Sequence, residues 1–218
     1  MDHVWLGLTS LADGMVVAII LGAFLVGNPR VSALGLLIFP VAGILTHVIK
    51  GLFPSLRPAA VLDTVHVIGP LLRSGAFPSG HAASAVAAGL AVAYYCSSRQ
   101  AGAAILLFAF LIALSRVFVG AHFPTDVMGG TILALAVFYV IVVLAWPRWE
   151  AGIPEEPCFS SPVFRRFLSV EIFAAFFVLL VYAPFLSDSP LFTSAVAAGV
   201  LAILAWGWLY RNVSRDAS

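Results

Sequence analysis

Charged side chains are scarce in this chain. It has 11 basic and 10 acidic residues among 218, which is 10% of the sequence, whereas soluble domains carry about 25%. Hydrophobic residues make up 62%, and the mean hydropathy is +1.07. This small number of charged side chains cannot cover a water-facing surface. The composition therefore excludes an ordinary soluble domain and favours a polytopic membrane protein.

Cysteines and basic runs are also lacking. The two cysteines, Cys96 and Cys158, are too few and too far apart to indicate a metal site or a disulfide framework. Lysine and arginine never gather into a run, so no nucleic-acid partner is predicted. There is no low-complexity tract and no internal repeat. We therefore expect one integral-membrane domain over residues 1–218.

Long apolar runs divide the sequence into candidate membrane helices. A helix needs about 20 apolar residues to cross the hydrocarbon core of a bilayer, which is about 30 Å thick. Such runs occur at 11–28, 31–49, 80–98, 101–119, 126–146, 168–186 and 191–210. The first run is shorter than the others. The prediction is an all-α transmembrane bundle of about seven spans, the last two forming an extra C-terminal pair. Residues 1–10 fit a helix along the membrane surface.

The placement of basic residues predicts the orientation, because cytoplasmic loops are enriched in lysine and arginine. With seven spans, one set of loops holds Arg30, Arg99, Arg148, Arg165, Arg166, Arg211 and Arg215. The other set holds Lys50, Arg57, Arg73 and Arg116. The larger set is predicted to be cytoplasmic, together with the connection 147–167 and the C-terminus.

Three polar clusters fall on the side predicted to face outward. They are KGLFPSLRP from Lys50 to Pro58, FPSGH from Phe77 to His81, and SRVFVGAHFPTD from Ser115 to Asp126. Each cluster alone has an ordinary structural explanation. A lysine at a helix end reaches the headgroups, a serine before an apolar run caps a helix, and an aspartate stabilises a first turn.

The conjunction of the clusters is harder to explain structurally. A charge at the centre of a bilayer costs roughly 2.5–3.5 kcal/mol or more, so cations gathered on one side indicate a polyanion to be bound. Arginine binds phosphate through two parallel hydrogen bonds, and a helix beginning at Gly80 would point free N–H groups at it. No cluster of Asp and Glu lies on this side, so no metal and no cofactor is predicted.

The three clusters resemble the three-part signature of the type 2 phosphatidic acid phosphatase superfamily. The matching patterns are Lys-x6-Arg-Pro, Pro-Ser-Gly-His and Ser-Arg-x5-His-x3-Asp, within a core of about residues 11–146. The resemblance implies a six-helix core in which His122 is the nucleophile, supported by Asp126, and His81 is the general acid. The residues alone leave the two histidines interchangeable.

The resemblance also implies which residues bind phosphate. They are Lys50, Arg57, Ser79, Gly80 and Arg116. Arg73, in the connection between the first two clusters, is a candidate headgroup contact if the substrate is a diphosphate.

The function implied is that of a membrane lipid phosphatase working at the outer face through a phosphohistidine. The preferred substrate is undecaprenyl diphosphate, hydrolysed to undecaprenyl phosphate. Phosphatidylglycerol phosphate, phosphatidate and lipid A 1-phosphate stay open as substrates, as does phosphoryl transfer from a polyprenyl diphosphate to another lipid. An anion-binding transporter is disfavoured because no charged path crosses the predicted bilayer centre. The oligomeric state is open.

Overall fold

The structure is a computed structural model that describes residues 2–153, and the regular secondary structure of this part of the chain is helical. Apart from a single bridge between Leu56 and Ser74, it contains no β-structure. The elements are α1 (Asp2–Ser10), α2 (Gly14–Ala23), η1 (Phe24–Val26), α3 (Pro29–Leu52), α4 (Pro58–Val61), α5 (Gly80–Tyr94), α6 (Arg99–Phe118), α7 (Pro124–Leu144) and α8 (Trp146–Glu150). The predicted all-α class is confirmed for the described residues.

Side-chain caps determine where several of these helices begin. Asn28 accepts a hydrogen bond from the N–H of Val31 at 3.3 Å at the start of α3. Ser98 does the same for Ala101 at 3.4 Å at the start of α6. Such caps satisfy backbone N–H groups that have no partner within the helix. The helices therefore begin close to where their apolar runs begin.

Three helices, α3, α6 and α7, are long and apolar enough to cross a membrane. The pair α1 and α2 meets the same test together, but it bends by 61° at its break. Helix α5 has only 15 residues, because the chain turns at Tyr95 instead of continuing to residue 98. The described residues thus contain fewer clear spans than predicted, and the runs 168–186 and 191–210 lie outside them.

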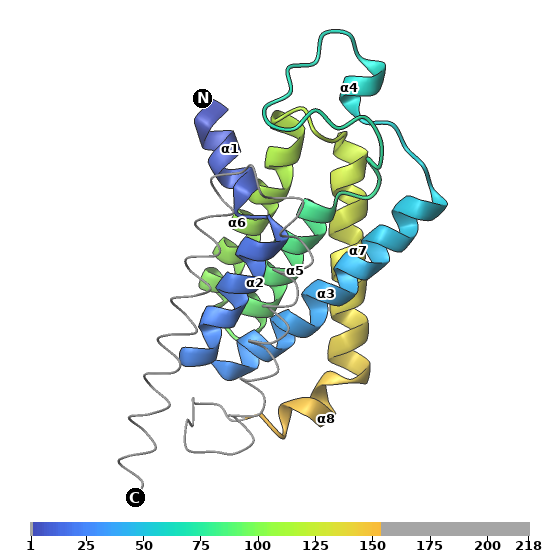
Figure 1. Ribbon diagram of the computed structural model, residues 1–218. Helices are drawn as coiled ribbons and strands as arrows, with labels where there is room; N and C mark the ends of the chain where they lie inside the picture. Colours follow the sequence, from blue (N-terminus) through green and yellow to red (C-terminus); the bar gives the residue numbers. More distant parts are fainter. Residues whose placement is uncertain (1, 154–218) are drawn as a thin grey trace, which may run out of the picture.

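Helix α5 is the centre of the bundle and packs against α3, α6 and α7 (Figure 1). Its buried face is made of small residues, among them Ala82, Ala83, Ala87 and Ala91. Large apolar side chains on the outer helices are exposed instead, including Val48, Leu107, Phe108, Ile132, Tyr139 and Val143. Small residues let backbones approach closely, and lipid tails solvate the large side chains, so this distribution is that of a membrane bundle.

The two ends of the bundle differ in character. Helix α4 and the long connection around it lie at one end, and α8 lies at the other (Figure 1). At the α8 end the buried Trp146 donates from Nε1 to the hydroxyl of Tyr95 at 2.7 Å, and that hydroxyl donates to Glu150 at 2.8 Å. This chain of hydrogen bonds ties the C-terminal end of α5 to α8.

Helix α7 approaches the start of α5 so closely that a side chain at Gly130 has no room. A Cβ there would overlap the carbonyl oxygen of Ser79 and lie 3.2 Å from the Cβ of Ala82. Gly130→Ala should therefore push α7 away from α5, and overpacking of this kind typically costs about 1–3 kcal/mol. We expect its thermal unfolding midpoint in detergent to fall by several degrees.

The matched control for this substitution is Gly43→Ala in α3, where an added Cβ meets nothing within 4 Å. Its midpoint should equal or slightly exceed that of the unsubstituted protein, because alanine favours the helix more than glycine does. Equal midpoints for the two variants would contradict the close approach of α7 to α5.

Candidate active site

The three polar clusters come together at the α4 end of the bundle, and main-chain hydrogen bonds join them. The N–H of Arg57 donates to the carbonyl of Arg73 at 3.0 Å, beside the Leu56–Ser74 bridge. The N–H of Ser79 donates to the carbonyl of Asp126 at 2.9 Å. The first bond joins Arg57 to the segment that leads into the second cluster, and the second bond joins the second cluster to the third.

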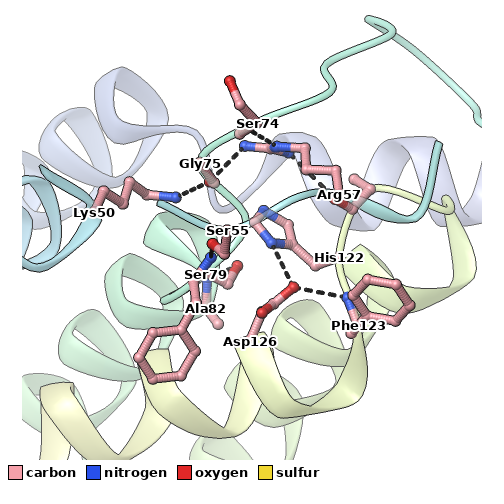
Figure 2. A network of polar contacts seen from close by, with 12 residues as sticks. Lys50, Ser55, Arg57, Ser74, Gly75, Ser79, Ala82, His122, Phe123 and Asp126 are labelled. Carbon is pink, nitrogen blue, oxygen red and sulfur yellow. Dashed lines mark hydrogen bonds and ion pairs between the residues drawn. The ribbon is translucent and has the colours of Figure 1, made fainter. Parts of the chain in front are cut away.

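The guanidinium of Arg57 is held by three main-chain carbonyl groups (Figure 2). It donates to Ser74 at 2.9 Å, to Ala121 at 3.2 Å and to Gly75 at 3.3 Å. The ammonium of Lys50 donates to the same Gly75 carbonyl. Burial lowers the pKa of Arg57 and the nearby Asp126 opposes that shift, but an arginine stays protonated in proteins. Two fixed positive charges therefore converge on one loop.

The imidazole of His122 lies between Asp126 and the Arg57 side of the site (Figure 2). Its Nδ1 is 3.5 Å from Oδ2 of Asp126, an ion-pair distance, although the geometry is not that of a hydrogen bond. The same Oδ2 accepts the N–H of Phe123 at 2.8 Å and so caps α7. Both His122 and Asp126 are buried. The other ring nitrogen, Nε2, is thus the one left for a substrate.

A tight turn between α6 and α7 carries His122. The N–H of His122 donates to the carbonyl of Arg116 at 3.2 Å, and Gly120 has φ of +69°. A side chain is strained at that φ, and a Cβ at Gly120 would also lie 2.5 Å from the carbonyl oxygen of His66. Glycine at this position therefore allows the turn to fold back under the outer connection.

The surroundings keep His122 neutral. Burial, followed by the positive charges of Arg57, Arg116 and Lys50, lowers the pKa of its imidazole from about 6.5 to about 2. A depressed pKa means that the deprotonated form prevails at every pH above it. His122 therefore has a free lone pair at neutral pH, as a nucleophile requires.

The start of α5 supplies uncharged donors next to these cations. Ser79 is fully buried and accepts the N–H of Ala82 at 3.3 Å, as the predicted N-cap. The N–H groups of Gly80 and His81, in the first turn, have no partner within the helix. His81 is half-buried and close enough to influence the titration of His122. A helix start of this kind is a site for an anion.

Every predicted catalytic and phosphate-binding residue thus belongs to one neighbourhood, with the single exception of the Arg73 side chain. The neighbourhood comprises Lys50, Arg57, Ser79, Gly80, His81, Arg116, His122 and Asp126. The side chain of Arg73 is exposed, and only its carbonyl contributes, by holding Arg57. Its contact with a headgroup stays a prediction.

Sequence reasoning missed several residues that shape the site. Ser55 accepts the N–H of Phe77 at 2.7 Å through its hydroxyl. Ser74, Gly75 and Ala121 contribute carbonyl oxygens, which any residue would supply and no sequence signal marks. Thr9 receives a hydrogen bond from Arg116 at 2.7 Å across 107 positions of sequence.

No group of three or more His, Cys, Asp or Glu side chains suited to a metal ion occurs in residues 2–153. Fold and site together define a membrane-embedded helical protein with a buried, neutral histidine near three cationic side chains. The sequence profile of the PAP2 superfamily matches residues 30–150. The chain belongs to this superfamily, and with its phosphatase relatives this makes it a lipid phosphatase.

Two curated relatives come from Bacillus subtilis (strain 168). The undecaprenyl-diphosphatase BcrC is 29% identical over 143 residues, covering 64% of this chain and 72% of that protein. Phosphatidylglycerophosphatase B is 31% identical over 147 residues, covering 62% and 68%. Among solved structures, LpxE of Aquifex aeolicus superposes with a TM-score of 0.60 at 26% identity, covering 65% of this chain and 84% of that one.

The depressed pKa of His122 makes a direct prediction. In protein labelled with ¹⁵N-histidine, the His122 imidazole should show the neutral form from pH 8 down to roughly pH 5, where an unperturbed histidine is mostly protonated. The spectrum of His122→Gln identifies the signal by its loss. A titration midpoint near the ordinary value would contradict the electrostatic description of the site.

Proposed function

We propose that this lipid phosphatase hydrolyses undecaprenyl diphosphate to undecaprenyl phosphate at the outer face of the bacterial cytoplasmic membrane. The observation that carries the proposal is the buried His122, neutral beside Asp126 and surrounded by three cationic side chains. The name of the relative BcrC supports the choice of lipid. Attack on phosphorus by a neutral imidazole, with cationic side chains nearby, is the reaction that this arrangement fits.

In the proposed mechanism, Nε2 of His122 attacks the terminal phosphorus, because Nδ1 faces Asp126. A nitrogen–phosphorus bond forms as the bond from phosphorus to the bridging oxygen breaks. His81, whose protonated form the negative charge of the bound substrate favours, gives its proton to that oxygen, so undecaprenyl phosphate leaves. Water, deprotonated by His81, then attacks the phosphohistidine and releases inorganic phosphate. Asp126 stabilises the positive charge that develops on the imidazole.

The remaining residues would stabilise charge on the phosphoryl oxygens. Lys50, Arg57 and Arg116 supply positive charge, and the first N–H groups of α5, next to Ser79 and at Gly80, supply neutral donors. Positioning and electrostatic stabilisation are most of what phosphoryl transfer requires. These groups must be in place before the reaction, and the carbonyls around Arg57 serve that purpose.

The choice of His122 over His81 as nucleophile rests on the carboxylate of Asp126, which faces His122. Among the described residues, Asp126 faces His122 at an ion-pair distance, and His81 forms no ion pair with an acidic side chain. A carboxylate on one ring nitrogen orients the imidazole and stabilises its cation. This observation supports an assignment that the residue types alone leave open.

Other lipid phosphates stay alternatives, since phosphatidylglycerophosphatase B and LpxE are also relatives. Phosphatidate and lipid A 1-phosphate present the same phosphate group, and a phosphohistidine could also pass its phosphoryl group to a second lipid. An anion transporter is less well supported, because the buried charged side chains Arg57 and Asp126 both lie at one end of the bundle.

We further propose that the α4 end faces outward and the C-terminus is cytoplasmic. In support, Arg30, Arg99 and Arg148 belong to the α8 end of the helices, whereas the four basic residues of the site region belong to the other. Residues 11–146 would form the catalytic core, 147–167 a cytoplasmic loop and 168–210 an accessory helical pair that completes seven spans.

A panel of purified lipid phosphates in detergent tests the reaction and the substrate together. We expect the highest kcat/KM for phosphate release from undecaprenyl diphosphate, compared with phosphatidylglycerol phosphate, phosphatidate and lipid A 1-phosphate. His122→Ala should lose about 10⁴-fold or more on every lipid, because the nucleophile is gone.

His47→Ala is the matched control for the panel, since His47 is exposed on α3 and takes no part in the proposed chemistry. Turnover retained by His122→Ala would refute the nucleophile assignment. A lipid other than undecaprenyl diphosphate at the top of the panel would refute the substrate. Phosphoryl transfer to an added acceptor lipid, in place of phosphate release, would identify a transferase.

Lys50, Arg57 and Arg116 provide the charge that a divalent cation provides in many phosphoryl-transfer enzymes. Phosphate release should therefore continue at an unchanged rate after treatment with EDTA and removal of the chelate. A loss of activity that magnesium restores would show that the side-chain cations are insufficient.

A further inference from the structure

Helix α1 contributes a side chain to the phosphate site. Nη1 of Arg116 donates to the hydroxyl of Thr9 at 2.7 Å. Thr9 is the one buried residue of α1, with 6% of its surface exposed. The superfamily profile matches only from residue 30, so neither the family match nor the three motifs assign this threonine a role.

The bond to Thr9 occupies one end of the Arg116 guanidinium and leaves its side edge available. Nε of Arg116 is buried and has no hydrogen-bond partner in residues 2–153. A buried N–H without a partner costs free energy, and the Nε–Nη2 edge of arginine is suited to two phosphate oxygens. The unpaired Nε thus belongs to the edge on which a phosphate would bind.

Two further contacts dock α1 beside the site. Trp5 stacks on Phe118, with ring centroids 4.0 Å apart and planes 7° from parallel. At the first residue of the helix, the exposed Asp2 lies 3.6 Å from His66 of the outer connection. Trp5 and Thr9 are one helical turn apart and therefore share a face, and Phe118 and Arg116 lie in the last turn of α6. The stack holds the hydroxyl of Thr9 against Arg116.

We propose that Thr9 is a positioning residue of the phosphatase site. Its hydroxyl holds Nη1 of Arg116, so that the Nε–Nη2 edge is oriented toward the substrate phosphate before the substrate arrives. The proposal rests on the proposed function of Arg116 as a phosphate contact. Arginine loses much rotational freedom when it binds, so fixing the guanidinium beforehand favours binding of phosphate.

The test compares isosteric and conservative substitutions of Thr9. Thr9→Val keeps the shape but removes the hydroxyl, and we expect KM for the best lipid of the panel and the inhibition constant of inorganic phosphate to rise about tenfold. Thr9→Ser keeps the hydroxyl and should stay within about twofold of the unsubstituted enzyme. Ser10→Ala is the control on the same helix, because the Ser10 hydroxyl only donates to the carbonyl of Leu6.

A double-mutant cycle separates positioning from a general effect on folding. In an Arg116→Ala background, Thr9→Val should cause no further rise in the inhibition constant of phosphate, because the group it positions is absent. Valine places a methyl group where the hydroxyl contacts Arg116, and this group could disturb the docking of α1. Thr9→Ala is a second variant that lacks both the hydroxyl and this methyl group. Thermal midpoints of all variants report whether the helix remains docked.

Three results would overturn the proposal. They are an equal effect of Thr9→Val with and without Arg116, a Thr9→Ser variant as impaired as Thr9→Val, and unchanged phosphate inhibition in both Thr9→Val and Thr9→Ala. Failure at Thr9 alone leaves the function of the site intact, since Arg116→Ala would still weaken phosphate binding. If Arg116→Ala itself leaves phosphate inhibition unchanged, the proposed role of Arg116 falls together with that of Thr9.

Discussion

Asp126 joins three parts of the site at once, and the rest of the arrangement depends on it. Its carbonyl accepts the N–H of Ser79, its carboxylate caps α7 through Phe123, and the same carboxylate faces His122. Because one residue makes all three contacts, the start of α5, the turn that carries His122 and the start of α7 cannot shift independently. The close approach of α7 at Gly130 makes this geometry sterically feasible.

Holding Lys50, Arg57 and Arg116 near the carboxylate of Asp126 costs electrostatic free energy when no anion is bound. Two like charges 4 Å apart repel by roughly 4 kcal/mol at an effective dielectric constant of 20, and one carboxylate cannot neutralise three cations. The carbonyl dipoles of Ser74, Gly75 and Ala121 offset part of the cost at Arg57. A phosphate would offset more. Donors held in place before the reaction need no reorganisation during it, which is the main source of electrostatic catalysis.

Local signals explain what the sequence predicts well. Ser79 before an apolar run predicts the start of α5, and Asp126 after Pro124 predicts a first turn, as the structure has them. The end of α5 was predicted four residues too late, because Cys96, Ser97 and Ser98 belong to a turn that apolarity alone does not reveal. The three short motifs also predict which side chains meet at one end of the bundle, and the structure brings them together there, while their roles stay predictions.

What the sequence does not predict depends on geometry between distant segments. The carbonyls that hold Arg57 could belong to any residue, so their positions follow only from the path of residues 73–77 and 120–122. Thr9 is an ordinary residue of an apolar helix until the fold brings it 2.7 Å from Arg116. Its distance in sequence and the absence of a motif leave no local signal for the contact.

The difference between motif residues and contacts from distant segments also bears on which lipid such an enzyme selects. The terminal phosphate is alike in undecaprenyl diphosphate and phosphatidylglycerol phosphate, so under the proposed function Lys50, Arg57 and Arg116 would contact a group that the candidate substrates share. Discrimination must therefore come from residues that contact what lies beyond that phosphate. Around this site such residues can come from the outer connection and from α1, whose first residue lies beside His66. On the proposed function, the segments outside the three motifs would thus differ in role from the motifs themselves, since the motifs would perform the chemistry and the other segments would determine which lipid reaches it.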